Sequence, residues 1–336
     1  MPTTTVPHSN VFTEQWLFGP LSFEDKALSL FRFQAAANPV YREYLALLNR
    51  DATKITALAQ IPFLPIGFFK HHAVSSRSGS AATVFESSGT TGQTRSRHHV
   101  HDTVWYEMVA RRLFEQAYGP LRDWHVLALL PSYLERTGSS LVYMVSHFVR
   151  ASGSSHGGFF LHDQQRLIEQ IEKLRKMDGK VLLIGVTFAL LELAERFGGR
   201  QWPDVIMMET GGMKGRREET TREEVHATLK AAFGLPAVHS EYGMTELLSQ
   251  AYSSGEGVFR MPPTMRVLLR DVNDPFYIHD CLRHGGLNVV DLANVDSCAF
   301  IETEDLGVLQ GPDEFKVLGR LDNADVRGCN LLLVPQ

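Results

Sequence analysis

The sequence is poor in cysteine and in basic charge. Its 336 residues include three cysteines, Cys281, Cys298 and Cys329, an odd number and too few for a disulfide scaffold. We therefore expect a reducing, cytoplasmic setting in which a thiol is free for chemistry. Lysine and arginine total 33 against 38 aspartates and glutamates, a net charge of −5 with no basic tract. That balance argues against a nucleic-acid partner.

Long apolar runs are also lacking. The first residues, MPTTT, have neither the charged segment nor the apolar stretch of a signal peptide. The most apolar run, 181–191, is shorter than the roughly 20 residues of a membrane-spanning helix, so we expect no membrane span. Hydrophobic residues at 44% and charged residues at 21% are typical of a globular protein. The length fits one large domain or two smaller ones.

From Asp102 to Gly234, helical patterns alternate with short apolar runs. Asp102 is a suitable N-cap for the first of these helices. Apolar strands that are separated by helices of ten or more residues are typical of a largely parallel sheet covered on both faces. Helices are expected at 102–118, 141–150, 163–177, 187–197 and 215–233, and strands at 126–130, 159–161, 181–184 and 205–208.

The flanking segments have other patterns. Apolar periodicity predicts helices at 24–37 and 40–49. Pro62 and Pro65 make 61–70 an extended, largely buried connector, and a short strand is expected at 82–85. Beyond Pro236 the β segments are expected at 265–269, 287–291, 299–302, 315–318 and 331–334. The predicted fold class is α/β, with layered, mostly parallel sheets and helices plus a β-rich C-terminal part.

Residues 86–94, ESSGTTGQT, form the most informative stretch. They follow a β-like segment and consist largely of glycines and hydroxyl residues. Glycine lets the backbone approach a ligand closely, and backbone N–H groups with Ser and Thr hydroxyls can wrap a polyphosphate. No Gly-Lys-Ser/Thr follows, so this is not a Walker A loop. Taken alone, the stretch fits an ordinary surface turn equally well.

Three later stretches are also polar and lie near predicted strands. Residues 239–246, HSEYGMTE, follow a strand and offer an aromatic ring, a hydroxyl and a carboxylate where α/β folds place ligand-binding residues. Residues 303–307, TEDLG, follow another strand and put the carboxylate of Asp305 at a turn. Residues 319–328 form a polar segment bounded by glycines.

With these four regions in this order, the chain resembles the adenylate-forming superfamily of acyl- and aryl-CoA ligases, adenylation domains and luciferases. It is more closely similar to the acyl-protein synthetase (LuxE-type) branch, through IPFLP at 61–65 with Phe69-Lys70, SSGTTG at 87–92 and RGCNLL at 327–332. The likeness covers about residues 61–336. It implies the fold of the large N-terminal domain of these enzymes. Residues 1–234 would be the α/β body with the phosphate-binding loop, and 235–336 would complete the nucleotide site.

The resemblance implies that ATP and Mg²⁺ activate a carboxylic acid, with a fatty acid as the expected type, by forming an acyl-adenylate. Tyr242 would flank adenine, Thr245 would contact the α-phosphate, Asp305 would accept from the ribose hydroxyls, and Glu246 would bind Mg²⁺. The implied ATP-binding residues are Ser87, Ser88, Thr90, Thr91, Gly92, Gly211, Gly212, Tyr242, Thr245, Asp305 and Arg320. Without the resemblance, Tyr242 is a packed aromatic and Asp305 a solvated turn carboxylate. The sequence Thr-Glu-Asp also departs from the family's usual Thr-Gly-Asp.

In most of the superfamily, the Gly-Arg-x-Asp segment leads to a mobile domain that carries a catalytic lysine. Here no lysine follows Asp322. Lys70 and Lys214 are the candidate substitutes, and a solvated surface lysine is the other interpretation of each. The likeness implies acyl transfer to the thiol of Cys329, whose thiolate Arg327 would favour, and then to a partner reductase or carrier protein. Alternatively, Cys329 is a small buried hydrophobe that enters a final strand.

The primary functional prediction is an ATP-dependent acyl-protein synthetase, a ligase that forms a carbon–sulfur bond. The alternatives are an acyl- or aryl-CoA ligase-like enzyme that passes the acyl group to CoA or a carrier protein, and a catalytically inactive nucleotide-binding subunit. His279, Cys281 and His284 form a His-x-Cys-x-x-His pattern. No second pair of suitable spacing follows, so we expect a loop with incidental ligands rather than a metal site.

Overall fold

The structure is a computed structural model that describes residues 11–88, 94–131, 138–211, 221–279 and 282–321. Its α-helices are α1 (Glu14–Phe18), α2 (Phe23–Ala37), α3 (Pro39–Leu47), α4 (Phe68–His71), α5 (Thr103–Tyr118), α6 (Ser140–Ser152), α7 (Gln164–Leu174), α8 (Thr187–Phe197) and α9 (Arg222–Phe233). Its strands are β1 (Leu64–Pro65), β2 (Thr83–Glu86), β3 (Arg97–Val100), β4 (Trp124–Leu129), β5 (Gly158–Phe159), β6 (Lys180–Gly185), β7 (Val205–Glu209), β8 (His239–Tyr242), β9 (Ala251–Ser253), β10 (Val258–Arg260), β11 (Met265–Arg270), β12 (Gly285–Asp291), β13 (Phe300–Gly311) and β14 (Glu314–Arg320).

Several helices begin where a side chain caps the free backbone N–H groups. The Ser22 hydroxyl accepts from the N–H of Asp25 at 3.1 Å at the start of α2. Asp102 Oδ1 accepts from the N–H of Trp105 at 2.9 Å at the start of α5, which confirms the predicted cap. In the described part of the chain, no helix is both long and apolar enough to cross a membrane.

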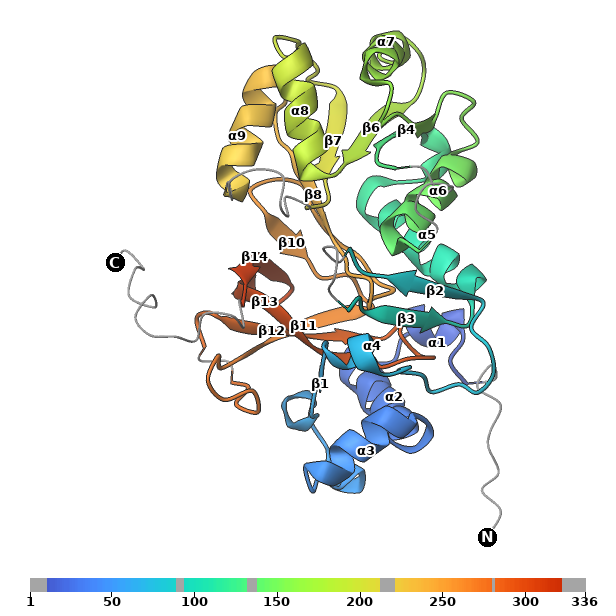
Figure 1. Cartoon of the computed structure of the whole chain (residues 1–336), viewed down its shortest axis with the longest axis vertical. Helices are drawn as coiled ribbons and strands as arrows, with labels where there is room; N and C mark the ends of the chain where they lie inside the picture. The colour runs from blue at the N-terminus through green and yellow to red at the C-terminus, as the bar shows by residue number, and fades with distance from the viewer. Residues whose placement is uncertain (1–10, 89–93, 132–137, 212–220, 280–281, 322–336) are drawn as a thin grey trace.

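The first half of the main sheet is parallel. Strands β5, β4, β6, β7 and β8 lie side by side in that order, and each is parallel to its neighbour. Alternate residues face opposite sides of the sheet: Leu127 and Leu183 pack with α7, α8 and α9, whereas Val126 and Leu182 pack with α5 and α6. Helices therefore cover both faces, as the apolar strands predicted (Figure 1).

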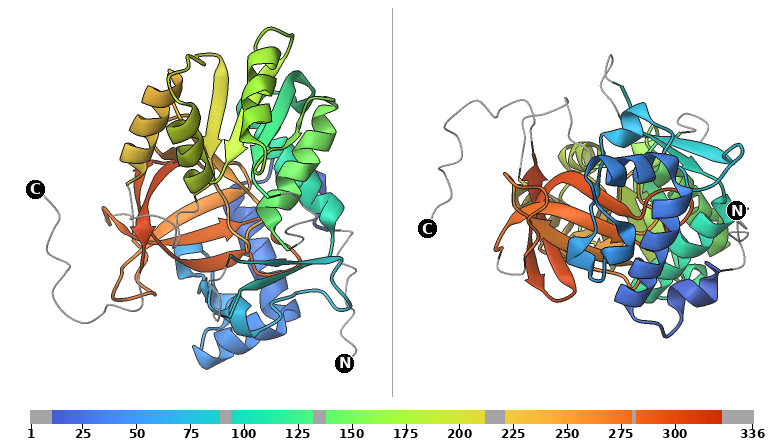
Figure 2. Two further views of the ribbon diagram at one scale, coloured as in Figure 1. Left: turned by 45° about the horizontal axis from the view of Figure 1, so that its top comes forward. Right: turned by 90° about the horizontal axis from the view of Figure 1, so that it is seen from below.

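The sheet changes character at β8. From there it continues through β9, β10, β14, β13, β12 and β11, and each of these pairs is antiparallel. Strands β2 and β3 form a separate hairpin. In Figure 2 the helix-covered parallel half and the strands β10–β14 form two adjoining parts of the molecule. The predicted β-rich C-terminal part is confirmed for the described residues.

The helices α2 and α3 lie against the turn between β12 and β13 (Figure 1). Gln34 Nε2 donates to the carbonyl oxygen of Asn294 at 2.8 Å, and Gln34 Oε1 accepts from the N–H of Ala299 at 2.9 Å. Asn38 Nδ2 donates to the carbonyl oxygen of Ser297 at 3.0 Å. These buried contacts join the two segments that the sequence assigns to different parts, 1–234 and 235–336. The division itself stays a prediction.

Three local predictions are wrong. The connector 61–70 was expected to be extended, but its last residues belong to the short helix α4. Proline lacks an N–H group and so disrupts a helix at its own position. Because α4 begins three residues beyond Pro65, its backbone N–H groups are free to form hydrogen bonds. Residues 303–307 do not form a turn: they lie inside β13, which pairs with β12 on one side and β14 on the other. Gly307 sits at an irregularity of this pairing, where a side chain would collide with the carbonyl oxygen of Lys316. Residues 239–242 do not follow a strand: they form β8 itself. Strands β3, β8, β9 and β10 were not predicted, and residues 215–220 and 331–334 lie outside the described residues.

Candidate functional site

Tyr242 ends β8, where the parallel and antiparallel halves of the sheet meet. Its ring packs on Phe259 of β10 and Phe315 of β14, with centroids 5.7 and 5.2 Å away, and the residue is 7% exposed. Its hydroxyl donates to Asp305 Oδ2 at 2.9 Å. Burial and the nearby Asp305 carboxylate raise the pKa of Tyr242, so the phenol stays protonated and can donate.

Asp305 and Arg320 lie opposite each other on β13 and β14. Arg320 Nε is 3.4 Å from Asp305 Oδ1, and Arg320 Nη2 is 3.7 Å from Glu304 Oε2. The Asp305 side chain is mostly buried, whereas the Arg320 side chain is 45% exposed. The pair therefore presents a fixed carboxylate beside an accessible cation, which can accept from a ligand hydroxyl and attract an anion.

The Glu246 carboxyl belongs to the same group of charges. Burial raises its pKa, while the Ser96 hydroxyl and the Arg320 charge lower it. Ser96 in turn closes the base of the loop that follows β2: its N–H donates to Ser87 Oγ at 3.0 Å, and the Ser87 N–H donates to the Ser96 carbonyl oxygen at 3.1 Å. Ser96 thereby links Ser87, at the start of the predicted phosphate loop, to Glu246.

Buried side chains hold the backbone around Glu246. Asp291, at the end of β12, accepts from the N–H groups of Leu248 and Ser249 at 2.7 and 3.0 Å. Asn294 Nδ2 donates to the carbonyl oxygen of Glu246 at 2.6 Å. Asp291 and Asn294 are both fully buried, so the segment after the Tyr-Gly-Met-Thr-Glu motif is fixed to the antiparallel half.

His98 of β3 fixes the same motif from the other side. Its Nδ1 is 2.9 Å from the carbonyl oxygen of Thr245. Burial lowers the pKa of His98 to about 4, so the ring is neutral near pH 7 and its Nδ1 carries the proton that this contact needs. The hairpin β2–β3 and the motif are thereby held in one arrangement.

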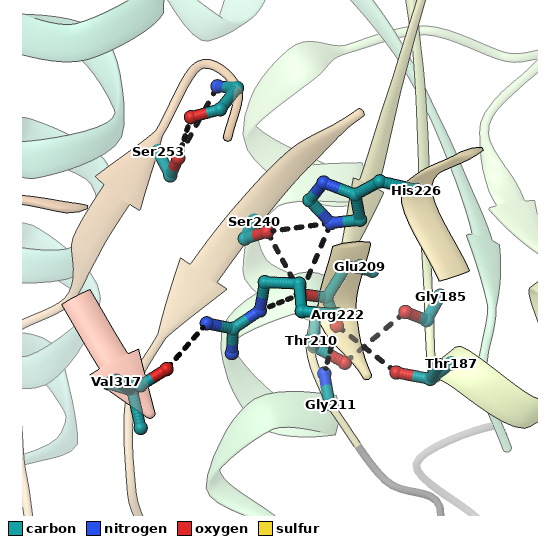
Figure 3. Close-up of polar contacts among 11 residues, drawn as sticks. Gly185, Thr187, Glu209, Thr210, Gly211, Arg222, His226, Ser240, Ser253 and Val317 are labelled. Atoms are coloured by element: carbon teal, nitrogen blue, oxygen red, sulfur yellow. Dashed lines mark hydrogen bonds and ion pairs between the residues drawn. The ribbon is translucent and has the colours of Figure 1, made fainter. Parts of the chain in front are cut away.

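Glu209 ends β7 and gathers donors from several elements (Figure 3). Its Oε2 accepts from the N–H of Gly211 at 2.8 Å and from Thr187 Oγ1 at 3.1 Å. Its Oε1 accepts from Ser240 Oγ at 2.9 Å and from Arg222 Nε at 3.1 Å. This 3% exposed carboxylate therefore ties β7 to α8, β8 and α9 and fixes Gly211, whose φ of 74° favours glycine.

Arg222 extends this network to the antiparallel half of the sheet. Its Nη1 donates to the carbonyl oxygen of Val317 in β14 at 3.3 Å (Figure 3). Its guanidinium lies 5.2 Å from the centroid of the Phe259 ring. Burial by itself would raise the pKa of Glu209. The donors around the carboxylate, including His226 with its Nε2 at 3.7 Å, and the Arg222 charge together lower the pKa to about 2.

The structure thus brings most of the described candidate residues together. Ser87, Tyr242, Glu246, Asp305 and Arg320 are linked by the contacts above; Ser88 and Thr245 are their chain neighbours, and Gly211 is joined through Glu209, Arg222 and Val317. Lys70 lies in α4, and none of the contacts among the described residues joins its side chain to this group. The candidates that lie outside the described residues are Thr90, Thr91, Gly92, Gly212, Lys214 and Cys329.

Sequence reasoning missed the residues that hold this group: Glu209, Arg222, Asp291, Asn294 and His98. An acidic residue at the carboxyl end of a predicted parallel strand is the one signal that could have pointed to Glu209. The others have no spacing pattern, because their partners are distant in the sequence. Asp291, for example, lies 42 residues from Ser249.

Glu246 is the residue that the sequence analysis expects to bind Mg²⁺, and this role stays a prediction. Mg²⁺ is usually held by one or two carboxylates together with water and phosphate oxygens. Among the described residues, no group of three or more His, Cys, Asp or Glu side chains could hold a metal ion.

Three solved structures illustrate what this fold is similar to. Two are 2-hydroxyisobutyryl-CoA ligase, in the postadenylation state with R3-HIB-AMP (12% identity) and in the thioesterification state with 2-HIB-AMP and CoA (14% identity); each has a TM-score of 0.66 and covers 89% of this chain and 67% of that chain. The third is ATP-bound MatB from Rhodopseudomonas palustris, with a TM-score of 0.53 and 18% identity over 73% of this chain.

The chain spans about half the length of MatB, 49% of it. At these identities the likeness concerns the fold: this chain has the α/β fold of these solved structures. No family model and no curated protein matches the sequence.

Proposed function

We propose that this chain, which has the fold of adenylate-forming ligases, uses ATP to activate a carboxylic acid as an acyl-adenylate. The observation that carries the proposal is the group formed by Tyr242, Glu246, Asp305 and Arg320 at the meeting of the two sheet halves. It combines a fixed carboxylate for ribose hydroxyls, an accessible cation for phosphate and a second carboxylate for the Mg²⁺ of MgATP.

In the proposed reaction, a carboxylate oxygen of the acid forms a bond to the α-phosphorus of ATP. The bond from that phosphorus to the bridging oxygen breaks, and pyrophosphate leaves with its magnesium. The protein's main task is to position the two reactants and to neutralise phosphate charge. Arg320 and the hydroxyl-rich loop at Ser87 and Ser88 would bind phosphates, Thr245 would contact the α-phosphate, and Tyr242 would hold Asp305 against the ribose.

The resemblance to acyl-protein synthetases supports a second step on Cys329. Its thiolate would attack the acyl carbon, a carbon–sulfur bond would form, the carbon–oxygen bond to AMP would break, and AMP would leave. Cys298 does not suit this role, because it is fully buried and burial raises its pKa to about 12. A partner reductase or carrier protein would then accept the acyl group.

Transfer to CoA is the second candidate function. It is supported by the similarity in fold to 2-hydroxyisobutyryl-CoA ligase, which has been solved with 2-HIB-AMP and CoA in the thioesterification state. In this case the acyl-adenylate forms in the same way, and the thiol of CoA takes the place of the Cys329 thiol.

Acid-dependent ATP–pyrophosphate exchange tests the first step. We expect exchange with at least one acid of a broad panel, and no exchange with any acid would refute both enzymatic proposals in favour of a nucleotide-binding subunit. Cys329→Ser then separates the two acceptors: exchange should continue, while stable acyl labelling of the protein disappears. Cys281→Ser is the matched control and should keep the label. Labelling that survives Cys329→Ser would show that another acceptor is used.

Glu246→Gln tests the magnesium role. We expect slower exchange and a requirement for more Mg²⁺, with little change in the melting midpoint, because the amide keeps the side chain's size and loses its charge. Glu43→Gln, at an exposed position of α3, is the control. An exchange rate equal to that of the unmodified protein would contradict the assignment.

A further inference from the structure

The strands β8 and β9 have two chemically different faces. Tyr242 points to the Asp305 side, and its neighbour Glu241 points to the opposite side, because successive side chains of a strand alternate. Glu241 lies directly across from Tyr252 of β9, so these two side chains share that opposite face. Gly243 and Gln250 continue it: a side chain at 243 would meet Glu241 Oε1 and, at 3.6 Å, Gln250 Cγ.

The polar groups on this face lack partners in the described part of the chain. Gln250 is 3% exposed and Tyr252 is 8% exposed, yet Gln250 Oε1 and the Tyr252 hydroxyl have no hydrogen-bond partner among the described residues. No hydrogen bond or ion pair joins the Glu241 carboxyl to a described residue either. Buried polar atoms without partners are rare in native proteins because each costs stability, so these two atoms, Gln250 Oε1 and the Tyr252 hydroxyl, call for an explanation. The Glu241 side chain beside them is half-buried.

The surroundings of Glu241 are aromatic and hold no compensating cation among the described residues. Tyr106 of α5 and Tyr252 are among its electrostatic neighbours, and the Tyr252 ring packs edge-on against Phe114 and Tyr118 of α5. Burial, with a smaller contribution from Glu209, raises the pKa of Glu241 to about 8. A carboxyl group in such a place is poised to pair with a donor that none of the described residues supplies.

This face adjoins the proposed reaction centre. Glu241 Oε1 lies where a side chain at Gly243, the second residue of the Tyr-Gly-Met-Thr-Glu motif, would be. The Tyr242 side chain, with its partner Asp305 of β13, lies on the other face of β8. A nucleotide bound at Asp305 and a second reactant bound at Glu241 would therefore approach the motif from opposite sides. That arrangement suits the in-line attack of an acid on the α-phosphorus.

We propose that the acid bound by this protein carries a hydrogen-bond-donating group, a hydroxyl or an ammonium, which Glu241, Gln250 Oε1 and the Tyr252 hydroxyl accept. This inference rests on the proposed function and names its substrate class. A plain alkyl chain, as in an unsubstituted fatty acid, would leave all three acceptors unpaired. A site built to bond a hydroxyl or amino group discriminates strongly against the analogue that lacks it, because the protein's own polar groups are then left buried and unpaired.

The test is ATP–pyrophosphate exchange with acids in matched sets. Each set contains a parent acid (butyrate, hexanoate or benzoate) and its hydroxy- and amino-substituted forms. We expect at least one substituted acid to exceed its parent by at least about tenfold in kcat/KM. Hydroxy and amino forms in each set distinguish the two donors. If the parents are used as well as every substituted form, the inference is overturned while acid activation stands. If no acid supports exchange, both are overturned.

Two variants test whether the preference for a substituted acid depends on the face that carries Glu241 and Tyr252. Tyr252→Phe removes one hydroxyl and keeps the ring, and Glu241→Leu removes the carboxyl. Each should reduce the kcat/KM ratio of the preferred acid to its parent at least about fivefold, whereas Glu43→Gln should leave the ratio unchanged. A ratio that both variants preserve would overturn the inference.

Thermal unfolding of Tyr252→Phe without ligand gives an independent readout, which holds even if Glu241→Leu does not fold. The variant deletes a buried hydroxyl that lacks a partner, so its melting midpoint should equal or exceed that of the unmodified protein. A clear fall in the midpoint would show that the hydroxyl is already bonded inside the protein, for instance to a trapped water, and would overturn the inference.

Discussion

Glu209→Gln should destabilise the protein, and the loss can be estimated from the structure. The two carboxylate oxygens of Glu209 accept four hydrogen bonds, two on each oxygen. Glutamine has nearly the same size but one acceptor oxygen, so its NH₂ group must face two donors that it cannot bond. The substitution also leaves the Arg222 guanidinium, whose side chain is 28% exposed, without its anionic partner.

Two estimates of the loss agree. Two lost bonds to a charged group, at about 1.5 kcal/mol each, give about 3 kcal/mol. The fall of the Glu209 pKa from its ordinary 4.5 to about 2 corresponds to about 3 kcal/mol of preferential stabilisation of the ionised form in the folded state. For 336 residues, an unfolding entropy of about 2.1 cal/mol/K per residue converts this loss into a decrease of about 4 °C in the melting midpoint.

The loss should depend on pH with a defined sign. Because folding lowers the pKa of Glu209, its contribution is fully present above the unfolded pKa of 4.5 and disappears as the pH falls towards about 2. The difference in stability between the unmodified protein and Glu209→Gln should therefore be constant from pH 8 to pH 6. It should narrow below pH 4.5, with more than half of it gone near pH 3.

Urea unfolding and thermal melts of the two proteins at several pH values provide the measurement. Glu43→Gln, an exposed acid-to-amide change in α3, is the control and should melt like the unmodified protein. A Glu209→Gln midpoint within about 1 °C of the unmodified protein at pH 7 would refute the estimate. A difference that persists unchanged at low pH would refute the assignment of the effect to the ionised carboxylate.

Three further predictions concern other parts of the site. Tyr242→Phe removes the hydrogen bond to Asp305 and should raise the KM for ATP in pyrophosphate exchange several-fold with a smaller effect on kcat; an unchanged KM would separate Asp305 from nucleotide binding. Asp291→Asn puts an NH₂ group where a carboxylate oxygen accepts from backbone N–H groups, so exchange should slow about tenfold at saturating ATP, and full activity would contradict the clamp. Gly307→Ala forces a methyl group against a carbonyl oxygen of β14 and should cost about 1–3 kcal/mol in urea unfolding, whereas wild-type stability would show that the strand can shift.

Local patterns predicted much of the fold. The cap at Asp102 and the helix at 187–197 agree with the structure, because capping and apolar periodicity depend on residues within one or two turns. The apolar runs at 126–130 and 181–184 mark strands that are buried on both faces, which only a helix-covered parallel sheet provides. The residues 303–307 were misplaced because polar residues and a glycine resemble a turn, while pairing with both β12 and β14 keeps them extended.

The candidate site could be predicted in its composition but not in its assembly. The sequence contains Tyr242, Glu246, Asp305 and Arg320 in motifs whose order resembles that of a known superfamily. It does not contain their mutual positions: Tyr242 and Asp305 are 63 residues apart, and their hydrogen bond depends on β14 lying between β10 and β13. Glu209 belongs to no sequence motif. Its role as the centre of a hydrogen-bond network follows only from the donors that surround its carboxylate in the structure.

By itself, then, the sequence determined the class of the fold, the positions of most helices and parallel strands, and which short segments carry groups suited to phosphate, ribose and magnesium. These properties follow from side-chain chemistry and from interactions between near neighbours in the chain. Only the tertiary structure decided which of those groups lie together. It shows that the Tyr242 hydroxyl donates to Asp305 while the Tyr242 ring is buried. It also places Glu241 on the opposite face of the strand, beside two acceptor atoms, Gln250 Oε1 and the Tyr252 hydroxyl, that have no partner among the described residues. The reason is that strand pairing joins residues across tens of positions, and the alternation of side chains along each strand then assigns neighbours such as Glu241 and Tyr242 to opposite faces.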